Sequence, residues 1–229
     1  LPLCNLNCDM CYVHLSKQET QSQGRLRSLD EWISLAKQMK DAGTLFLLLT
    51  GGEPLLFHQF KELYCALKDM GMILTLNTNG TLINEEWAEF FAKNKPRRIN
   101  ITLYGSKNET YENLCHMKDG FDKTIRGIEL LKKYKIDVKI NGSLVKKNFH
   151  DRMEIIDIGE KYDIPVRIDT YMYPSVRERT TPFNFQERLN PEDAAKARVE
   201  ILHREMGDEL FEQYAKQTIY LAEHTEEGD

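Results

Sequence analysis

The sequence lacks the features that define several specialised classes of protein. It has no apolar run near the roughly 18 residues of a membrane span. With a net charge of −5 and a pI near 5.8, it has no overall positive charge to attract nucleic acid. It begins at Leu1 with neither an initiator Met nor a secretory leader, a start that is compatible with a missing upstream piece. We therefore expect a cytoplasmic protein with neither nucleic acid nor membrane as a partner.

Cysteine is scarce, with five residues in 229, but Cys4, Cys8 and Cys11 fall within one short stretch. Cysteines this close do not pair sensibly as a disulfide framework, which leaves metal binding or catalysis. A structural zinc needs four ligands, and His14 could complete a Cys3His set. A four-iron cluster would instead use three cysteines and leave one iron open to a small molecule. The spacing alone favours neither group decisively.

Apolar strands alternate with amphipathic helices along most of the chain. The expected strands are 44–50, 72–78, 98–104, 137–145 and 166–173, and the expected helices are 28–43, 57–70, 84–94, 120–134 and 149–162. With a truncated first strand before Cys4, this makes six strand-helix units, which predicts an α/β fold. We expect a partial (β/α)6 TIM-like barrel over residues 1–174, followed by a helical C-terminal extension over residues 175–229.

Polar and glycine-rich sequences follow the expected strands. The cysteines follow the first strand, Gly-Gly-Glu-Pro at 51–54 follows the second, and Asn-Thr-Asn-Gly at 77–80 follows the third. In such barrels the carboxyl ends of the strands form one mouth, where reactive residues lie. We expect four polar side chains to point toward it, either as substrate or cofactor contacts or as hydrogen-bonded structure: Asn77, Asn79, Lys139 and Asn141.

Two motifs in this order resemble a known family. Cys-x3-Cys-x2-Cys, with an aromatic residue after the third cysteine, precedes Thr-Gly-Gly-Glu-Pro by about forty residues and an apolar strand. The pair resembles the radical S-adenosylmethionine (radical SAM) superfamily, over Leu3 to about Pro174. The resemblance implies that the three cysteines hold a [4Fe-4S] cluster whose open iron binds S-adenosyl-L-methionine. Reductive cleavage of that cofactor would give a 5'-deoxyadenosyl radical that abstracts hydrogen from a substrate.

The resemblance also implies which residues surround S-adenosylmethionine. They are Met10, Gly51, Gly52, Glu53, Pro54, Thr102 and Met172. The glycine-rich segment would bind the methionine amino group, Thr102 the methionyl or ribose portion, and the two methionines the adenine. Outside this context the methionines would be core residues and Thr102 an ordinary strand residue. No catalytic acid or base is assigned.

The segment from Ile101 to Tyr134 looks like the SPASM-type branch, whose members modify peptides and proteins or mature peptide-derived cofactors. Cys115 stands where that pattern usually has glycine, and the arginine of sulfatase-maturing relatives is missing. Cys115 itself is expected to be packed. No cysteine follows it, so the cysteine-rich module of auxiliary clusters in that branch is not in this sequence.

We therefore expect a radical SAM enzyme that forms a thioether or carbon-carbon crosslink, or an oxidised residue, in a ribosomally synthesised peptide. An external one-electron reductant would be its partner. Two alternatives remain open. One is a radical SAM enzyme of small-molecule cofactor biosynthesis, and the other is a non-catalytic, zinc-stabilised binding protein that uses the three cysteines and His14.

Overall fold

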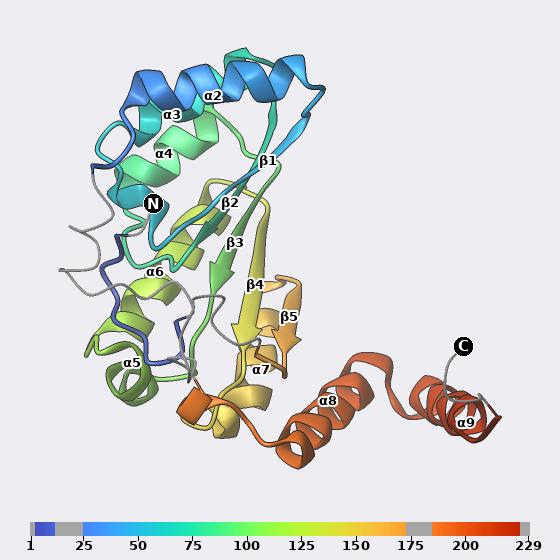
Figure 1. Ribbon diagram of the computed structural model, residues 1–229. Coiled ribbons are helices and arrows are strands. Elements are labelled where there is room, and N and C mark those ends of the chain that lie inside the picture. The colour runs from blue at the N-terminus through green and yellow to red at the C-terminus, as the bar shows by residue number, and fades with distance from the viewer. Residues whose placement is uncertain (1–2, 12–24, 173–184, 225–229) are drawn as a thin grey trace. The chain divides into compact units, whose positions relative to one another are not determined.

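The computed structural model describes residues 3–11, 25–172 and 185–224, which fall into two compact units (Figure 1). The first unit is Leu1–Arg188 and the second is Leu189–Asp229. The boundary predicted between residues 174 and 175 lies outside the described residues, so that division of the chain stays a prediction.

The first unit contains a five-stranded parallel sheet in the order β1-β2-β3-β4-β5. The strands are β1 (Phe46–Leu49), β2 (Ile73–Thr78), β3 (Arg98–Thr102), β4 (Val138–Ser143) and β5 (Val166–Asp169). Each lies within a strand predicted from the sequence, and the α/β class is confirmed. No strand forms among the described residues before Cys8, although the carbonyl of Leu3 accepts a hydrogen bond from the Glu53 N–H at 2.8 Å.

Helices connect these strands. They are α2 (Leu29–Asp41), α3 (Phe60–Asp69), α4 (Glu85–Lys93), α5 (Asn108–Cys115), α6 (Gly120–Lys133) and α7 (Arg152–Tyr162), with short 3₁₀ turns η1 (Pro54–Leu56), η2 (Phe149–Asp151) and η3 (Phe185–Glu187). The start of α2 is fixed by a reciprocal capping box between Ser28 and Glu31, and that of α4 by the Asn84 side chain. Of these α-helices, only α5 was not expected.

The core lies between the sheet and its helices. Along β2 and β3 buried residues alternate with half-buried ones, because successive strand side chains point to opposite faces. The buried face carries Leu74, Leu76, Ile99 and Ile101, none more than 1% exposed. Figure 1 shows α3, α4 and α6 together on one side of the sheet. The opposite face is consequently free to line a site.

Strand β1 differs from the sequence expectation. Its apolar residues were predicted to be buried on both faces, yet Phe46 is 67% and Leu48 is 51% exposed. The reason is its position: β1 is the edge of the described sheet and pairs only with β2.

The second unit consists of α8 (Pro191–Met206) and α9 (Asp208–His224). As predicted, Asn190 caps α8, accepting a hydrogen bond from the Asp193 N–H at 2.7 Å, and Pro191 occupies its first turn. Gly207 separates the helices with a φ of +74°, a left-handed value that suits glycine. Across the described parts of both units, no helix combines the length and the apolar character needed to cross a membrane.

Candidate cofactor site

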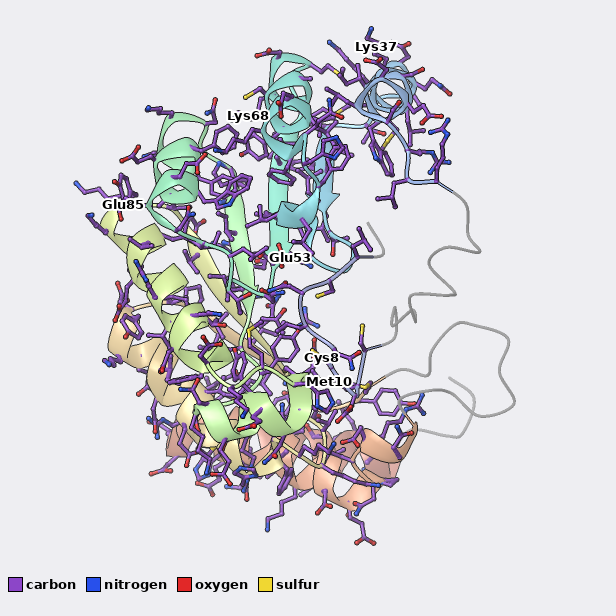
Figure 2. All side chains as sticks on the ribbon, turned by 90° about the vertical axis from the view of Figure 1, so that its left-hand side faces the viewer. Cys8, Met10, Lys37, Glu53, Lys68 and Glu85 are labelled. Atoms are coloured by element: carbon purple, nitrogen blue, oxygen red, sulfur yellow. The ribbon has the colours of Figure 1, made fainter. Side chains whose placement is uncertain are left out.

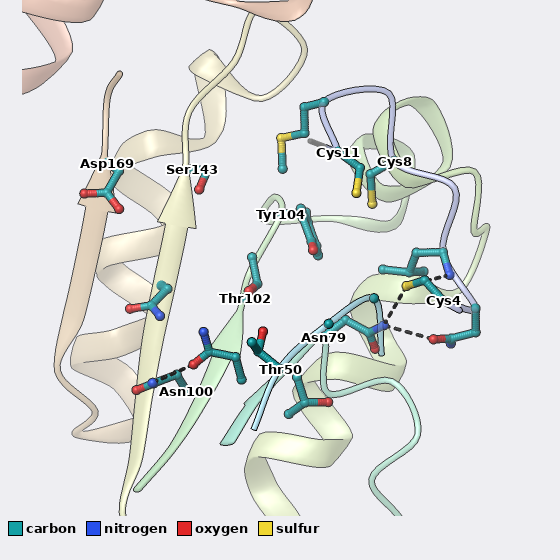
Figure 3. Close-up of a pocket in the computed structure, with 18 of the residues that line it drawn as sticks. Cys4, Cys8, Cys11, Thr50, Asn79, Asn100, Thr102, Tyr104, Ser143 and Asp169 are labelled. Carbon is teal, nitrogen blue, oxygen red and sulfur yellow. Dashed lines mark hydrogen bonds between the residues drawn. The ribbon is translucent and has the colours of Figure 1, made fainter. Parts of the chain in front are cut away.

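A cavity of about 900 Å³ lies at the carboxyl ends of the strands, against the segment Leu3–Cys11, here called the cysteine loop (Figure 3). It brings together nearly all the site residues predicted from the sequence. Those that line it are Cys4, Cys8, Met10, Cys11, Gly51, Gly52, Asn77, Asn79, Thr102, Lys139, Asn141 and Met172. The predicted residues Glu53 and Pro54 do not line it.

Glu53 lies behind the cavity wall and is fully buried. Its carboxylate accepts hydrogen bonds from the backbone N–H groups of Leu55 and Asn79, at 3.1 and 2.9 Å, and from the hydroxyl of Thr78. Burial raises the pKa of Glu53, and these hydrogen bonds oppose the rise. Figure 2 shows Glu53 in the interior of the first unit, whereas the charged residues Lys37, Lys68 and Glu85 lie on helices at its periphery. Here the carboxylate joins the loop after β1 to the end of β2, and its contact with a cofactor stays a prediction.

Asn79 fixes the start of the cysteine loop. Its amide nitrogen donates to the side-chain oxygen of Asn5 at 2.9 Å and approaches the Cys4 sulfur at 3.8 Å (Figure 3). Its oxygen accepts from the backbone and hydroxyl of Thr81. Asn79 is only 5% exposed, so these bonds form in a largely dry environment. Asn79 is thus hydrogen-bonded within the protein and also lines the cavity, and its contact with substrate or cofactor stays a prediction.

Gly52 brings the two motifs into direct contact. A Cβ atom at this position would lie 2.3 Å from the carbonyl oxygen of Leu3 and 3.0 Å from the Cβ of Cys4. Only glycine permits this approach of the two backbones. The glycine-rich loop therefore helps to position the cysteine loop.

The other side of the cysteine loop is attached to the end of α5. The N–H groups of Asn7 and Asp9 donate to the carbonyls of Cys115 and Leu114, at 3.1 and 3.0 Å. Carbonyls in the last turn of a helix have no hydrogen-bond donor within the helix, and here the N–H groups of the cysteine loop supply one. Cys115 is fully buried, as expected, and its burial and the neighbouring Cys8 thiol raise its pKa.

A group of charged side chains, here called the Asp9 clamp, holds the middle of the loop. The Asp9 carboxylate contacts the Nε2 of His116 at 2.7 Å and the ammonium of Lys147, which also lies 3.6 Å from Glu187. Burial alone would raise the pKa of Asp9, but hydrogen bonds from Lys147 and His116 hold it below its ordinary value. The clamp thereby links the cysteine loop to α5, to the segment after β4 and to η3.

The thiol set fits an iron-sulfur cluster, whose ligands are cysteine thiolates. Cys4, Cys8 and Cys11 are free of disulfides and face one cavity. In Figure 3 Cys8 and Cys11 lie together and Cys4 lies apart from them. Among the described residues, no three His, Cys, Asp or Glu side chains are gathered closely enough to hold a single metal ion. His14, the fourth ligand of the zinc alternative, lies outside the described residues.

Several lining residues were not singled out from the sequence. They are Asn5, Leu6, Asn7, Thr50, Thr78, Asn100, Tyr104, Ser143, Arg167 and Asp169. Side chains alternate between the two faces of a strand, and this alternation could have predicted some of them. Asn100 and Tyr104 lie on the same face as Thr102, and Ser143 lies on the same face as Asn141. Burial, with the nearby thiols, raises the pKa of Tyr104 well above its ordinary value, so its hydroxyl stays protonated.

The chain matches the model of the "Radical SAM superfamily" over residues 1–159, well over half its length. It belongs to the radical SAM superfamily. The recognition made from the cysteine and Gly-Gly-Glu-Pro motifs is thereby confirmed. A [4Fe-4S] cluster and S-adenosylmethionine are the cofactors of this radical SAM protein, and solved structures of its fold relatives contain S-adenosylmethionine.

Similar proteins act on different kinds of substrate. An AdoMet-dependent heme synthase of Methanosarcina barkeri is 31% identical over 193 residues, covering 82% of this chain and 54% of that protein. A cysteine-type anaerobic sulfatase-maturating enzyme of Clostridium perfringens is 34% identical over 152 residues, covering 60% of this chain and 40% of the other.

A solved structure with the same fold is that of Streptococcus suis SuiB bound to its precursor peptide SuiA. It superimposes with a TM-score of 0.70 at 19% identity, covering 93% of this chain and 49% of that one. At this identity the likeness demonstrates the partial-barrel fold alone. The chain spans about half the length of these three proteins.

Proposed function

We propose that this radical SAM enzyme modifies a ribosomally synthesised peptide, forming a thioether or carbon-carbon crosslink or oxidising a residue, as in the SPASM-type branch. The observation that carries the radical SAM chemistry is the convergence of Cys4, Cys8 and Cys11 with the Gly51–Gly52 backbone on one cavity. A [4Fe-4S] cluster and S-adenosylmethionine held at this cavity would together supply one-electron reduction and radical abstraction of a hydrogen atom from the substrate.

The chain's own residues hold and orient these groups. Cys4, Cys8 and Cys11 would bind three irons of the cluster, and the carbonyls of the glycine-rich loop would accept hydrogen bonds from the methionine amino group. Thr102, on the cavity face of β3, donates to the methionyl or ribose portion. Met10 and Met172 line the cavity with the soft apolar surface that suits an adenine ring. These side chains also keep water away from a reactive centre.

Two observations support a peptide substrate. A cavity of about 900 Å³ is close to the upper end of the range that encloses one drug-sized ligand. It accommodates S-adenosylmethionine and one inserted side chain more readily than the cofactor and a second large molecule. Moreover, one fold relative was solved with a precursor peptide bound, and one sequence relative is a sulfatase-maturating enzyme.

A second candidate is a small-molecule radical SAM enzyme of cofactor biosynthesis. The Methanosarcina barkeri heme synthase covers 82% of this chain, against 60% for the sulfatase-maturating enzyme. A tetrapyrrole is thus the small-molecule substrate to test first. The external one-electron reductant and the cytoplasmic location expected from the sequence are unaffected by this choice, and both stay predictions.

The first experiment measures S-adenosylmethionine cleavage under anaerobic conditions. The protein is reconstituted with iron and sulfide, reduced, and assayed for 5'-deoxyadenosine beside Cys8→Ala and Cys65→Ala variants. Cys65 is a matched control because it lies in α3, away from the cavity-lining residues. We expect cleavage in wild type and Cys65→Ala and none in Cys8→Ala.

Three results would contradict the proposal in different ways. Cleavage by Cys8→Ala would contradict the ligand assignment. Tight zinc binding without an iron cluster or cleavage would favour the zinc-stabilised binding protein. Cleavage that is stimulated by a tetrapyrrole, but by no peptide encoded near the gene, would replace the peptide proposal with the second candidate.

A further inference from the structure

The wall of the cavity opposite the cysteine loop is made of polar side chains in register. Asn77 of β2 pairs with Asn100 of β3, which pairs with Lys139 of β4. All three line the cavity, as does Asn141, two residues further along β4. Because parallel strands in register carry their side chains at one level, Asn77, Asn100 and Lys139 form a polar row across three strands. This row is here called the cavity floor.

The floor lies well below the rim at which the cysteines gather. Ser143 ends β4 on the far side of the cavity from Cys8 and Cys11 (Figure 3), and Lys139 precedes it by four residues on the same strand face. At about 3.3 Å per residue, the backbone of Lys139 is about 13 Å deeper than that of Ser143. A ligand that reaches the floor therefore extends away from the cluster.

The floor carries donors that nothing in the described structure satisfies. Lys139 is half-buried, and its side chain forms no ion pair or hydrogen bond with a described residue, nor does the side chain of Asn141. The Asn100 amide donates to the Asn77 oxygen at 2.7 Å, which leaves the Asn77 amide nitrogen without a described partner. None of these nitrogens is a fully buried donor without a partner, so they are open to the cavity and can donate to an acceptor supplied from outside.

The charge of the wall indicates the kind of acceptor. Apart from the cysteines, the charged residues that line the cavity are Lys139, Arg167 and Asp169, and Arg167 is paired with Asp169 at 3.1 Å. One positive charge is left, which matches a single negative charge on a ligand. Asn77 and Asn141 would add neutral N–H donors, so the floor suits a carboxylate better than a doubly charged phosphate.

We propose that the cavity floor is a carboxylate subsite, in which Lys139, Asn77 and Asn141 bind an acidic group of the substrate remote from the reacting carbon. This inference rests on the proposed function and narrows its substrate to a carboxylate-bearing molecule. The carboxylate belongs either to an acidic side chain of a peptide or to a propionate of a tetrapyrrole. In both cases the contact fixes the distance between the anchored group and the cofactor, which determines the carbon that faces it.

The test compares acidic and neutral probes on the reconstituted full chain with S-adenosylmethionine present. One pair is a capped pentapeptide with glutamate at its centre and its glutamine counterpart. The other pair is coproporphyrin III and its tetramethyl ester. Dissociation constants are measured for wild type, Lys139→Gln, Lys139→Arg and Lys146→Gln. Lys146 is the matched control because it is exposed, does not line the cavity and bonds to the Gln186 carbonyl.

We expect wild type to bind the acidic member of at least one pair about tenfold more tightly than the neutral member, the usual scale for a hydrogen bond to a charged group. Lys139→Gln should lose that preference, whereas Lys139→Arg and Lys146→Gln should keep it. A preference in the peptide pair identifies an acidic peptide, and one in the tetrapyrrole pair identifies a propionate.

The proposal is overturned if wild type prefers neither acidic probe, or if Lys139→Gln keeps the full preference. Formation of 5'-deoxyadenosine by wild type, measured on the same samples, distinguishes failure of the carboxylate subsite from failure of the proposed function. Cleavage without an acidic preference removes the carboxylate subsite alone. Absence of cleavage with an iron cluster in place removes the proposed function.

Discussion

At the scale of single residues, Gly52 and Glu53 act first on the protein's own loops. The Gly-Gly-Glu-Pro motif predicts contact with a cofactor, and the backbone of Gly52 does line the cavity. Yet the missing side chain of Gly52 also makes room for Leu3, and the Glu53 carboxylate is occupied by three donors of the chain. The motif therefore shapes the place where the cysteine loop lies.

The first prediction concerns Gly52→Ala. The added Cβ would lie 2.3 Å from the Leu3 carbonyl oxygen, so the cysteine loop must shift. We expect a loss of stability of about 1–3 kcal/mol and a several-fold fall in iron bound per chain after reconstitution. Denaturant unfolding and iron analysis measure the two effects.

Gly71→Ala is the control for this prediction. Gly71 has a φ of +83° but open space around it, so alanine there should cost about 1–2 kcal/mol through backbone strain without affecting iron content. Gly52→Ala protein that holds iron as well as wild type would contradict the proposed packing of the two motifs.

The residues of the cavity could be predicted from the sequence only where a motif or a clear alternation marked them. Lys139 and Asn141 were found because polar residues alternate with buried Val138 and Ile140 along one strand. Arg167 and Asp169 follow the same rule in β5 but were missed, since that strand is short and flanked by other polar residues. The structural role of Glu53 was not predictable, because it depends on how close β2 comes to the loop after β1.

At the scale of elements, the cysteine loop is held from several sides and has no regular structure of its own. Asn79 at the end of β2, the last carbonyls of α5 and the Asp9 clamp all contact it. The sequence could not predict the second of these contacts, because α5 itself was not expected. Its polar stretch resembles a loop, and the helix is stabilised by burial of Tyr111 and Leu114.

The second prediction tests the Asp9 clamp with Lys147→Met, which removes the ammonium that joins Asp9 to Glu187. The side chain of Lys147 is 37% exposed and that of Asp9 is 23% exposed, so water screens their interaction. We therefore expect the free energy of unfolding to fall by no more than about 1 kcal/mol. The loop should nevertheless open more often, and a chelator should remove iron several-fold faster than from wild type.

Lys146→Met is the matched variant for the clamp. Lys146 is the adjacent residue, and its ammonium bonds to the Gln186 carbonyl and not to Asp9. It should release iron at the wild-type rate. If both variants release iron equally fast, the effect does not come from the clamp.

At the scale of the whole molecule, the order of strands and crossover helices was the most predictable property. Strand β1 is a short apolar run, the other strands of the parallel sheet carry apolar residues at alternate positions, and the crossover helices carry a periodic apolar face. The exposure of β1 was not predictable, because an apolar run such as this one is compatible with an edge strand as well as with a central strand of a sheet. Helix α9 lies within the predicted helical extension but was not singled out as a separate helix, because among its described side chains none is buried and no apolar face had to be preserved.

The third prediction concerns the stability of the whole first unit when its cofactors are bound. S-adenosylmethionine at one hundred times its Kd should stabilise the cluster-loaded protein by about 2.7 kcal/mol. For a chain of this size that corresponds to a rise in Tm of about 5–10 °C. Anaerobic calorimetry measures it, with Cys8→Ala as the variant that lacks one cluster ligand. An equal rise in that variant would show that the cofactor binds without the cluster.

The attachment of the cysteine loop to α5 has an electronic consequence. Asn7 and Asp9 direct their N–H groups to helix carbonyls, and Cys11 directs its own to the carbonyl of Cys8. The backbone N–H of Leu6, by contrast, points at a cysteine sulfur, at 3.4 Å from that of Cys4. Hydrogen bonds to sulfur ease the reduction of a cluster because they stabilise its added negative charge. A cluster held by this loop would gain no such stabilisation from the N–H groups of Asn7 and Asp9, because the last carbonyls of α5 already accept them.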